Sequence, residues 1–267
     1  MDRFSALISD IGDLLAVYWK SYLINLGNTL LLALVATAIG CLIGLICGIL
    51  NTIPYTKNDP LPKRFLLKLI RIIVRVYVEV FRGTPMVLQA VFIFYGLPYF
   101  SNNQYRFDSM WAAAILIVSI NTGAYMAESV RGGIISIDRG QTEAARSIGM
   151  THWQSMVHVV LPQAVRNIMP SIGNEFVVNI KDSSVLNVIS VNELFFMSKS
   201  AAGTYLRYFE VFFITACIYL VLTFTVTRLL RLLERRMDGK TNYIIYGSQS
   251  DSKASIVVPK EGGVPND

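Results

Sequence analysis

The sequence has little charge, few cysteines and few histidines, and each shortage excludes a class of protein. Only 16% of its 267 residues are charged, whereas soluble domains average about a quarter. The three cysteines, Cys41, Cys47 and Cys217, all lie inside apolar runs, which argues against a disulfide framework. The two histidines, His152 and His158, have no carboxylate or thiol partner at ligand spacing, so no metal site is expected.

Catalytic chemistry is also missing from the pattern. No serine, cysteine or paired-carboxylate arrangement indicates an active site. Gly239-Lys240-Thr241 resembles the end of a phosphate-binding loop, but the first glycine of that motif would fall on Glu234, and no strand is expected before it. We therefore predict that the chain is not an enzyme and has no cofactor of its own.

The net charge of +6 does not indicate a nucleic-acid partner, because the basic residues cluster between long apolar runs. Positive charge between membrane spans collects on the cytoplasmic side. This rule predicts an extracellular N-terminus and a cytoplasmic C-terminus. Lys and Arg are frequent in residues 57–82, 131–166 and 228–240 and sparse in residues 1–20, 99–108 and 190–210.

The apolar residues, 53% of the chain, are gathered into runs that approach the ~20 residues needed to cross a bilayer. We predict an all-α integral membrane protein with five transmembrane helices in a domain of residues 29–236. Residues 1–28 are expected to form an amphipathic helix at the membrane interface, and residues 237–267 a disordered cytoplasmic tail. The expected spans are about 29–50, 70–97, 109–130, 164–189 and 209–232.

Three glycines in the first expected span, Gly40, Gly44 and Gly48, recur every fourth residue. They place a flat stripe on one helix face, which favours close packing against another helix.

Charged residues fall inside two of the expected spans. The apolar run 86–97 is too short to cross alone, so the second span must begin near Ile72 and must include Glu79 and Arg82. Intramembrane charges usually face a polar interior, and the neighbouring break Gly83-Thr84-Pro85 exposes backbone donors suited to an anionic ligand. The alternative is a Glu79–Arg82 pair that only neutralises itself.

The fourth expected span is also too polar to face lipid. Glu175 lies about 20 Å beyond Pro162 along a helix, near the middle of the bilayer. Lys181 and Asp182 follow it, either on a polar path or as a structural pair. The candidate path residues are Arg82, Gly83, Thr84, Pro85, Asn121, Tyr125, Glu128, Glu175, Asn179, Lys181, Asp182 and Ser183.

A polar loop at residues 137–162 separates the third and fourth spans. A short helix is expected from about Ile137 to Met150, with Asp138 as its N-cap and Gly149 at its end. The spacing of Glu143-Ala144-Ala145, Gly149 and Leu161-Pro162 resembles the EAA loop of ABC-importer permeases, although Val159 stands where that family more often has Ile. The resemblance implies a cytoplasmic coupling helix that docks on a separate ATPase. Its implied coupling residues are Glu143, Ala144, Ala145, Arg146, Gly149, Leu161 and Pro162.

Three further stretches are similar to the permeases of polar amino-acid importers, of the histidine, glutamine and arginine type. They are residues 77–86, which end in Phe-Arg-Gly-Thr-Pro-Met, residues 125–134, with Met126 at the variable site, and Lys181-Asp182-Ser183-Ser184. The resemblance extends over about residues 20–236.

The resemblance implies a permease in a bacterial inner membrane. Its implied partners are a second permease chain, identical or a sister, ATPase subunits that bind ATP and Mg, an extracellular amino-acid-binding protein and an amino-acid substrate. The alternative is a secondary transporter or channel whose intramembrane charges serve as ion or proton sites. A third alternative is an ABC permease for another substrate, such as an osmolyte. Such a permease would keep the EAA loop but would not be expected to have the motif Phe81-Arg82-Gly83-Thr84-Pro85.

Overall fold

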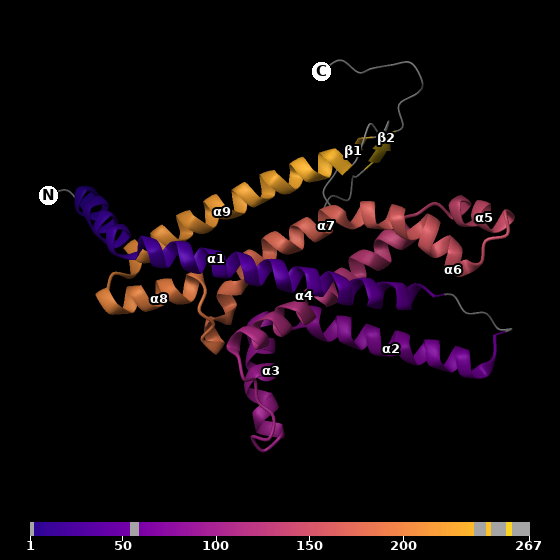
Figure 1. The fold of residues 1–267 in the computed structure, drawn as a ribbon, viewed down its shortest axis with the longest axis horizontal. Coiled ribbons are helices and arrows are strands. Elements are labelled where there is room, and N and C mark those ends of the chain that lie inside the picture. Colours follow the sequence, from indigo (N-terminus) through magenta and orange to yellow (C-terminus); the bar gives the residue numbers. More distant parts are fainter. Residues whose placement is uncertain (1–2, 54–58, 238–243, 247–254, 258–267) are drawn as a thin grey trace, which may run out of the picture.

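The computed structural model describes residues 3–53, 59–237, 244–246 and 255–257, and these residues are almost entirely helical (Figure 1). Among them, three helical segments are long and apolar enough to cross a membrane: Leu7–Thr52, Met110–Ile135 and Tyr208–Arg236. The all-α architecture is thereby confirmed in its coarse form.

The first helix, α1 (Arg3–Thr52), is a single helix of 50 residues. The expected division into an interfacial helix at residues 1–28 and a span at residues 29–50 is therefore wrong as a helix boundary. No proline occurs between Arg3 and Thr52, and a helix can pass from water into lipid without a break because all its backbone bonds are internal.

The expected second span of residues 70–97 is two helices, α2 (Leu61–Gly83) and α3 (Met86–Phe100). The break has a local cause. Pro85 has no backbone N–H to donate and disfavours helical geometry in Thr84, which is extended at φ −123° and ψ 144°. From this break α3 turns away from the line of α2 and projects from the body of the molecule (Figure 1).

The helix α4 (Met110–Ile135) is the central element, and most of its length is buried. It packs along the glycine stripe of α1, which confirms the predicted role of that stripe. A Cβ atom added at Gly44 would lie 2.3 Å from the Cβ of Met126, and one added at Gly48 would lie 2.5 Å from Val130. Only glycine allows α1 this close to α4.

The loop after α4 contains α5 (Arg139–Ser147), α6 (His152–Ser155) and a π-helical turn, η1 (Met156–Val160), which leads directly into α7 (Leu161–Asp182). The π turn fits its sequence, because Pro162 has no N–H for a regular helical bond and Leu161 N–H donates instead to Met156 O. A 3-10 turn, η2 (Ser183–Ile189), continues α7 to the end of the expected fourth span.

Residues 190–208, between the fourth and fifth expected spans, contain a helix that the sequence does not predict, α8 (Leu194–Tyr205). Glu193 is fully buried and caps it by accepting hydrogen bonds from Phe195 N at 2.9 Å and Phe196 N at 2.6 Å. Tyr219 of α9 and Thr29 of α1 also donate to this carboxylate. Burial raises the pKa of Glu193, while these hydrogen bonds act in the opposite direction.

The last helix, α9 (Tyr208–Met237), is followed by two short strands, β1 (Ile244–Tyr246) and β2 (Ser255–Val257), which pair antiparallel. The paired strands correct the expectation of a fully disordered tail. The rest of residues 238–267 lies outside the described residues. In Figure 1 the C-terminal end of α1, the start of α2, α5 and α6 lie towards one end of the molecule, and α8 lies at the other.

Gly44→Ala tests the packing of α1 on α4. The new Cβ would meet Met126 at 2.3 Å, so we expect a loss of about 1–3 kcal/mol in stability from overpacking. Gly27→Ala in the same helix is the matched control, because no described atom lies within 4 Å of its added Cβ. Thermal unfolding in detergent measures both, and equal midpoints would contradict the close contact.

Candidate substrate path and coupling loop

One amide side chain, that of Gln89, bridges the break between α2 and α3. Gln89 Nε2 lies 2.8 Å from Phe81 O, 2.9 Å from Thr84 O and 2.9 Å from Thr84 Oγ1. Its Oε1 accepts from Asn121 Nδ2 of α4 at 2.9 Å. Two carbonyl groups at the break, those of Phe81 and Thr84, are therefore satisfied within the protein.

A hollow of about 660 Å³ lies beside this break, and we call it the path hollow. It combines the break residues with both signs of charge, and it brings together eight of the twelve candidates from the sequence. Those eight are Arg82, Gly83, Thr84, Pro85, Asn121, Tyr125, Glu175 and Asp182, and Met86, Asn174 and Val178 complete the lining.

Arg82 is oriented by residues of α4. Its guanidinium pairs with Glu128 and lies 5.3 Å from the ring centroid of Tyr125. Glu128 is also 3.7 Å from Arg131. The partner of Arg82 is therefore Glu128, and the alternative of a self-neutralising pair with Glu79 does not describe the structure.

A second hollow of about 530 Å³ adjoins the first, and the two share Arg82, Tyr125 and Glu175. It adds Glu128 of α4 and Asn167 and Ser171 of α7 to the lining. The two hollows together form one continuous polar groove between α4 and α7.

Three of the sequence candidates lie outside this groove. Asn179 is 2% exposed and bridges helices, with Nδ2 donating to Thr37 Oγ1 at 2.8 Å and to Thr122 Oγ1 at 2.9 Å. Ser183 is buried and donates to Ile180 O. Lys181 is exposed and lines neither hollow. The structure thus gives Asn179 and Ser183 packing roles in place of a lining role.

Gln89, which bridges the break, and Glu193, which caps α8, are not among the candidates that the sequence indicates. Gln89 stands alone in an apolar run after the break, and a lone amide there indicates an internal partner. Glu193 gave no local signal, because its partners Thr29 and Tyr219 lie far away in the sequence.

The loop of residues 137–162, which we call the coupling loop, has the expected local geometry. Asp138 caps α5 by accepting from Gly140 N at 2.7 Å, and Gly149 has φ +87°, which ends the helix in a conformation that favours glycine. Ala145 is buried, whereas Glu143, Ala144 and Arg146 are exposed on the outer face of α5.

The end of the loop is attached to the helices of the membrane domain. Leu161 packs against the apolar cluster formed by α4, η1 and α7, which includes Val130, Val160 and Ile168. Pro162 is exposed in the first turn of α7. Glu143, Ala144 and Arg146 therefore face outward, while Leu161 connects the loop to the groove-lining helices.

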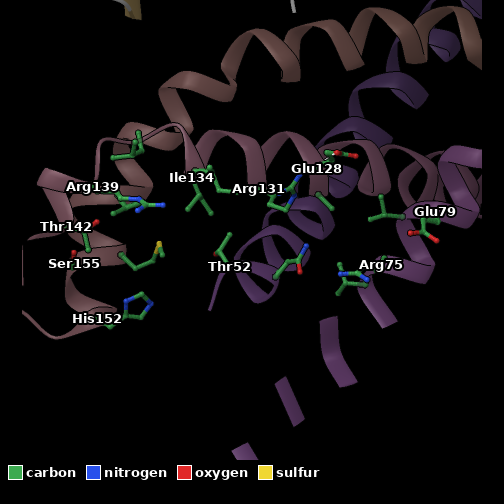
Figure 2. Close-up of a pocket in the computed structure, with 18 of the residues that line it drawn as sticks. Thr52, Arg75, Glu79, Glu128, Arg131, Ile134, Arg139, Thr142, His152 and Ser155 are labelled. Atoms are coloured by element: carbon green, nitrogen blue, oxygen red, sulfur yellow. Dashed lines mark ion pairs between the residues drawn. The ribbon is translucent and has the colours of Figure 1, made fainter. Parts of the chain in front are cut away.

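A third hollow, of about 750 Å³, lies between the coupling loop and the membrane helices, and we call it the basic hollow (Figure 2). In Figure 2, Arg139, Thr142, His152 and Ser155 lie at one end, and Arg75, Glu79 and Glu128 lie at the other. It also includes Arg82, which it shares with the path hollow.

Comparison with known proteins assigns the fold to a family. Residues 40–239 match the family described as the binding-protein-dependent transport system inner membrane component. The glutamine transport system permease GlnP of Escherichia coli (strain K12) is 35% identical over 210 residues, 78% of this chain and 89% of GlnP. The probable amino-acid permease YxeN of Bacillus subtilis (strain 168) is 35% identical over 223 residues, 82% of this chain and 96% of YxeN.

A solved structure agrees with these relatives. The crystal structure of an amino acid ABC transporter with histidines matches with a TM-score of 0.72 and 37% identity, and it covers 83% of this chain and 96% of that chain. The inward-facing methionine transporter MetNI matches at 19% identity with a TM-score of 0.66, which supports the fold alone.

The fold, the groove and the coupling loop therefore define a multi-pass permease of the inner membrane. The chain belongs to the binding-protein-dependent transport family, within the branch of polar amino-acid permeases that the sequence motifs indicated. It is a transport subunit and not an enzyme, and ATP is bound by a separate ATPase. Systems of this family also include a substrate-binding protein.

Gln89→Ala tests the support of the break. It removes the amide that bonds Phe81 O, Thr84 O and Asn121, so we expect a loss of about 1–3 kcal/mol in stability together with reduced transport. Gln104→Ala, in the exposed loop after α3, is the control. The measurements are thermal unfolding and uptake by the reconstituted importer. Normal values for Gln89→Ala in both would show that the break needs no such support.

Proposed function

We propose that this chain, paired with a second permease chain, forms the path along which a polar amino acid crosses the inner membrane. The observation that carries the proposal is the path hollow, where a cation and two carboxylates meet beside an interrupted helix. A zwitterionic amino acid needs both signs of charge. The named relatives support this class, since they include permeases for glutamine, arginine and octopine.

The residues of the path hollow divide between the two ends of the substrate. Arg82 suits a carboxylate, and so does the N-terminus of α3 at Met86, where the first backbone N–H groups of a helix have no helical partner. Glu175 and Asp182 suit an ammonium group, and within the described chain neither carboxylate has an ion-pair partner. Arg82 is held by Glu128, so substrate binding would rearrange that pair.

The topology that fits this function has five crossings. Three are the long apolar helices, and we infer that the α2–α3 pair and the α7–η2 segment make the other two. The N-terminus is then extracellular and the C-terminus cytoplasmic. In support, the basic start of α2 lies at the same end of the molecule as α5 in Figure 1.

The exposed face of α5 fits a coupling role. ATP-driven closure of the ATPase subunits would displace Glu143, Ala144, Ala145 and Arg146, with Gly149 as the turn. Leu161 and Pro162 would carry the displacement into α7, which lines the groove. The permease pair would then alternate between outward and inward access.

Glu175→Gln and Asp182→Asn test the substrate assignment. Each removes a charge that would bond the ammonium, so we expect uptake to fall about tenfold or more while assembly is preserved. The control is Asp13→Asn, an exposed carboxylate on α1 outside the path hollow. Uptake is measured in proteoliposomes that contain the complete importer. Wild-type uptake by both path variants would refute the assignment.

Glu143→Lys tests the coupling assignment. Reversing an exposed charge on α5 should reduce co-purification of the ATPase, or the stimulation of ATP hydrolysis, at least several-fold. The control is Asp108→Lys, a reversal of an exposed charge in the loop after α3. The reference is the amount of ATPase that co-purifies with the wild-type chain in a mild-detergent pull-down from the native membrane. If the chain purified alone and moved solute without ATP, it would be a secondary transporter.

A further inference from the structure

We propose that Tyr77 is a positioning residue for the substrate path. Its hydroxyl group attaches the C-terminal part of α2 to α4, and this attachment determines where the guanidinium of Arg82 lies in the path hollow. Tyr77 lines none of the three hollows, so it acts only through Arg82. The inference rests on the proposed function, in which Arg82 binds the carboxylate of the substrate.

Tyr77 joins α2 to α4 by a hydrogen bond from its side chain to the backbone. Its Oη donates to Ile120 O at 2.5 Å, at the short end of the range for O–H···O bonds. The side chain is half-buried and lies on the same face of α2 as the buried Val74, one helical turn earlier. In a membrane, where hydrophobicity does not drive helices together, hydrogen bonds between helices contribute to their association. The bond therefore fixes α2 relative to α4 at this level.

Gly123 of α4 leaves the space that the tyrosine hydroxyl occupies. A Cβ atom added at Gly123 would lie 2.7 Å from Tyr77 Oη and 2.7 Å from Cγ2 of Ile43 in α1. Contacts this short require the neighbouring atoms to shift, so a larger residue at this position would displace the hydroxyl from Ile120 O. The hydroxyl of Tyr77 and the absence of a side chain at Gly123 therefore fit each other.

A second attachment follows one helical turn later, at Phe81. The Phe81 ring lies against the Tyr77 ring, with 5.3 Å between the ring centroids, and Phe81 O accepts from Asn121 Nδ2 at 3.3 Å. Asn121 directly follows Ile120, so both attachments end on one turn of α4. The Asn121 bond is long, and the Tyr77 bond is the shorter of the two. Together they fix the position and the rotation of the end of α2.

Arg82 takes the position of its backbone from these two attachments, because it directly follows Phe81. Its side chain is held separately, by an ion pair with Glu128 and beside the ring of Tyr125, and both of these residues lie further along α4. The backbone and the guanidinium of Arg82 are therefore both positioned by α4. Without the Tyr77 hydroxyl, α2 would be free to shift against α4, and the guanidinium would lose its alignment with a carboxylate in the path hollow.

The first test is a double-mutant cycle on the thermal unfolding of the complete importer in detergent. Tyr77→Phe removes the hydroxyl and keeps the ring, and Arg82→Gln removes the guanidinium and its ion pair. We expect the fall in midpoint caused by Tyr77→Phe to be about halved or smaller in the Arg82→Gln background, because the effects of interacting residues are not additive. Equal falls in both backgrounds would show a merely structural contact and would overturn the proposal. Should Arg82→Gln not assemble, Glu128→Gln removes the same ion pair.

The second test is uptake by the importer in proteoliposomes, with radiolabelled glutamine or arginine, whichever the wild-type importer carries faster. We expect Tyr77→Phe to lower uptake about threefold or more while assembly is preserved. The matched control is Tyr95→Phe, which also removes a hydroxyl bonded to a backbone oxygen, that of Val188 at 3.3 Å, outside the groove. Wild-type uptake by Tyr77→Phe would overturn the proposal. If instead Arg82→Gln kept wild-type uptake, the proposed function would fail, whereas the unfolding cycle would still decide whether Tyr77 positions Arg82.

Discussion

The close approach of α1 and α4 is the contact on which the rest of the structure depends. Gly40 faces Thr122 across this contact, and the same Thr122 hydroxyl bonds Asn179 of α7. Asn179 also donates to Thr37 of α1, so one amide connects three helices beside the glycine contact. In a membrane, where hydrophobicity does not drive helices together, close backbone packing and buried hydrogen bonds are the available forces. Glu175 and Asp182 lie one helical turn from Asn179 on either side, so the glycine contact also determines where the charges of the path are placed.

Polar groups within a membrane carry a free-energy cost, and the structure limits that cost along the path by pairing most of them. The break at Gly83 to Pro85 leaves carbonyl groups without helical partners, and Gln89 with Asn121 satisfies them. Arg82 is neutralised by Glu128 and lies beside the ring of Tyr125. After these pairings, the carboxylates of Glu175 and Asp182 are the charges in the path hollow without a partner in the described chain. The polar groups that support the break are therefore paired within the protein, whereas the carboxylates of Glu175 and Asp182 are left for a zwitterionic substrate to pair with.

The sequence predicted those features whose cause is local. The glycine stripe, the Asp138 cap, the end of α5 at Gly149 and the break before Pro85 each follow from a few neighbouring residues. Features determined by distant partners were missed or misplaced. The sequence predicts Asn179 as a path residue. Its contacts with Thr37 and Thr122 span 142 and 57 positions, so no local pattern indicates that its amide is bonded within the protein. The sequence does not predict α8, because its N-cap Glu193 is buried and depends on the distant Thr29 and Tyr219 as well as on Phe195 N and Phe196 N. The sequence does not predict the continuity of α1, because the charges of residues 1–28 favour an interfacial helix separate from the span, although charge limits burial and not helix formation.

The coupling loop and the path are joined by one packed cluster and one ion pair. Leu161 and Val160 pack with Val130 and Ile168, so a displacement of α5 and α6 acts on α4 and α7 together. These are the two helices that form the polar groove, and a packed cluster transmits displacement because its side chains leave no free volume. The Arg82–Glu128 pair stands between the path hollow and the basic hollow, and Arg82 lines both. A substrate carboxylate that draws Arg82 toward the path would remove one cation from the basic hollow and leave Glu128 to Arg131 alone, so the net positive charge of the basic hollow would fall. The occupancy of the path and the charge of the basic hollow would therefore be linked through Arg82, the residue that lines both.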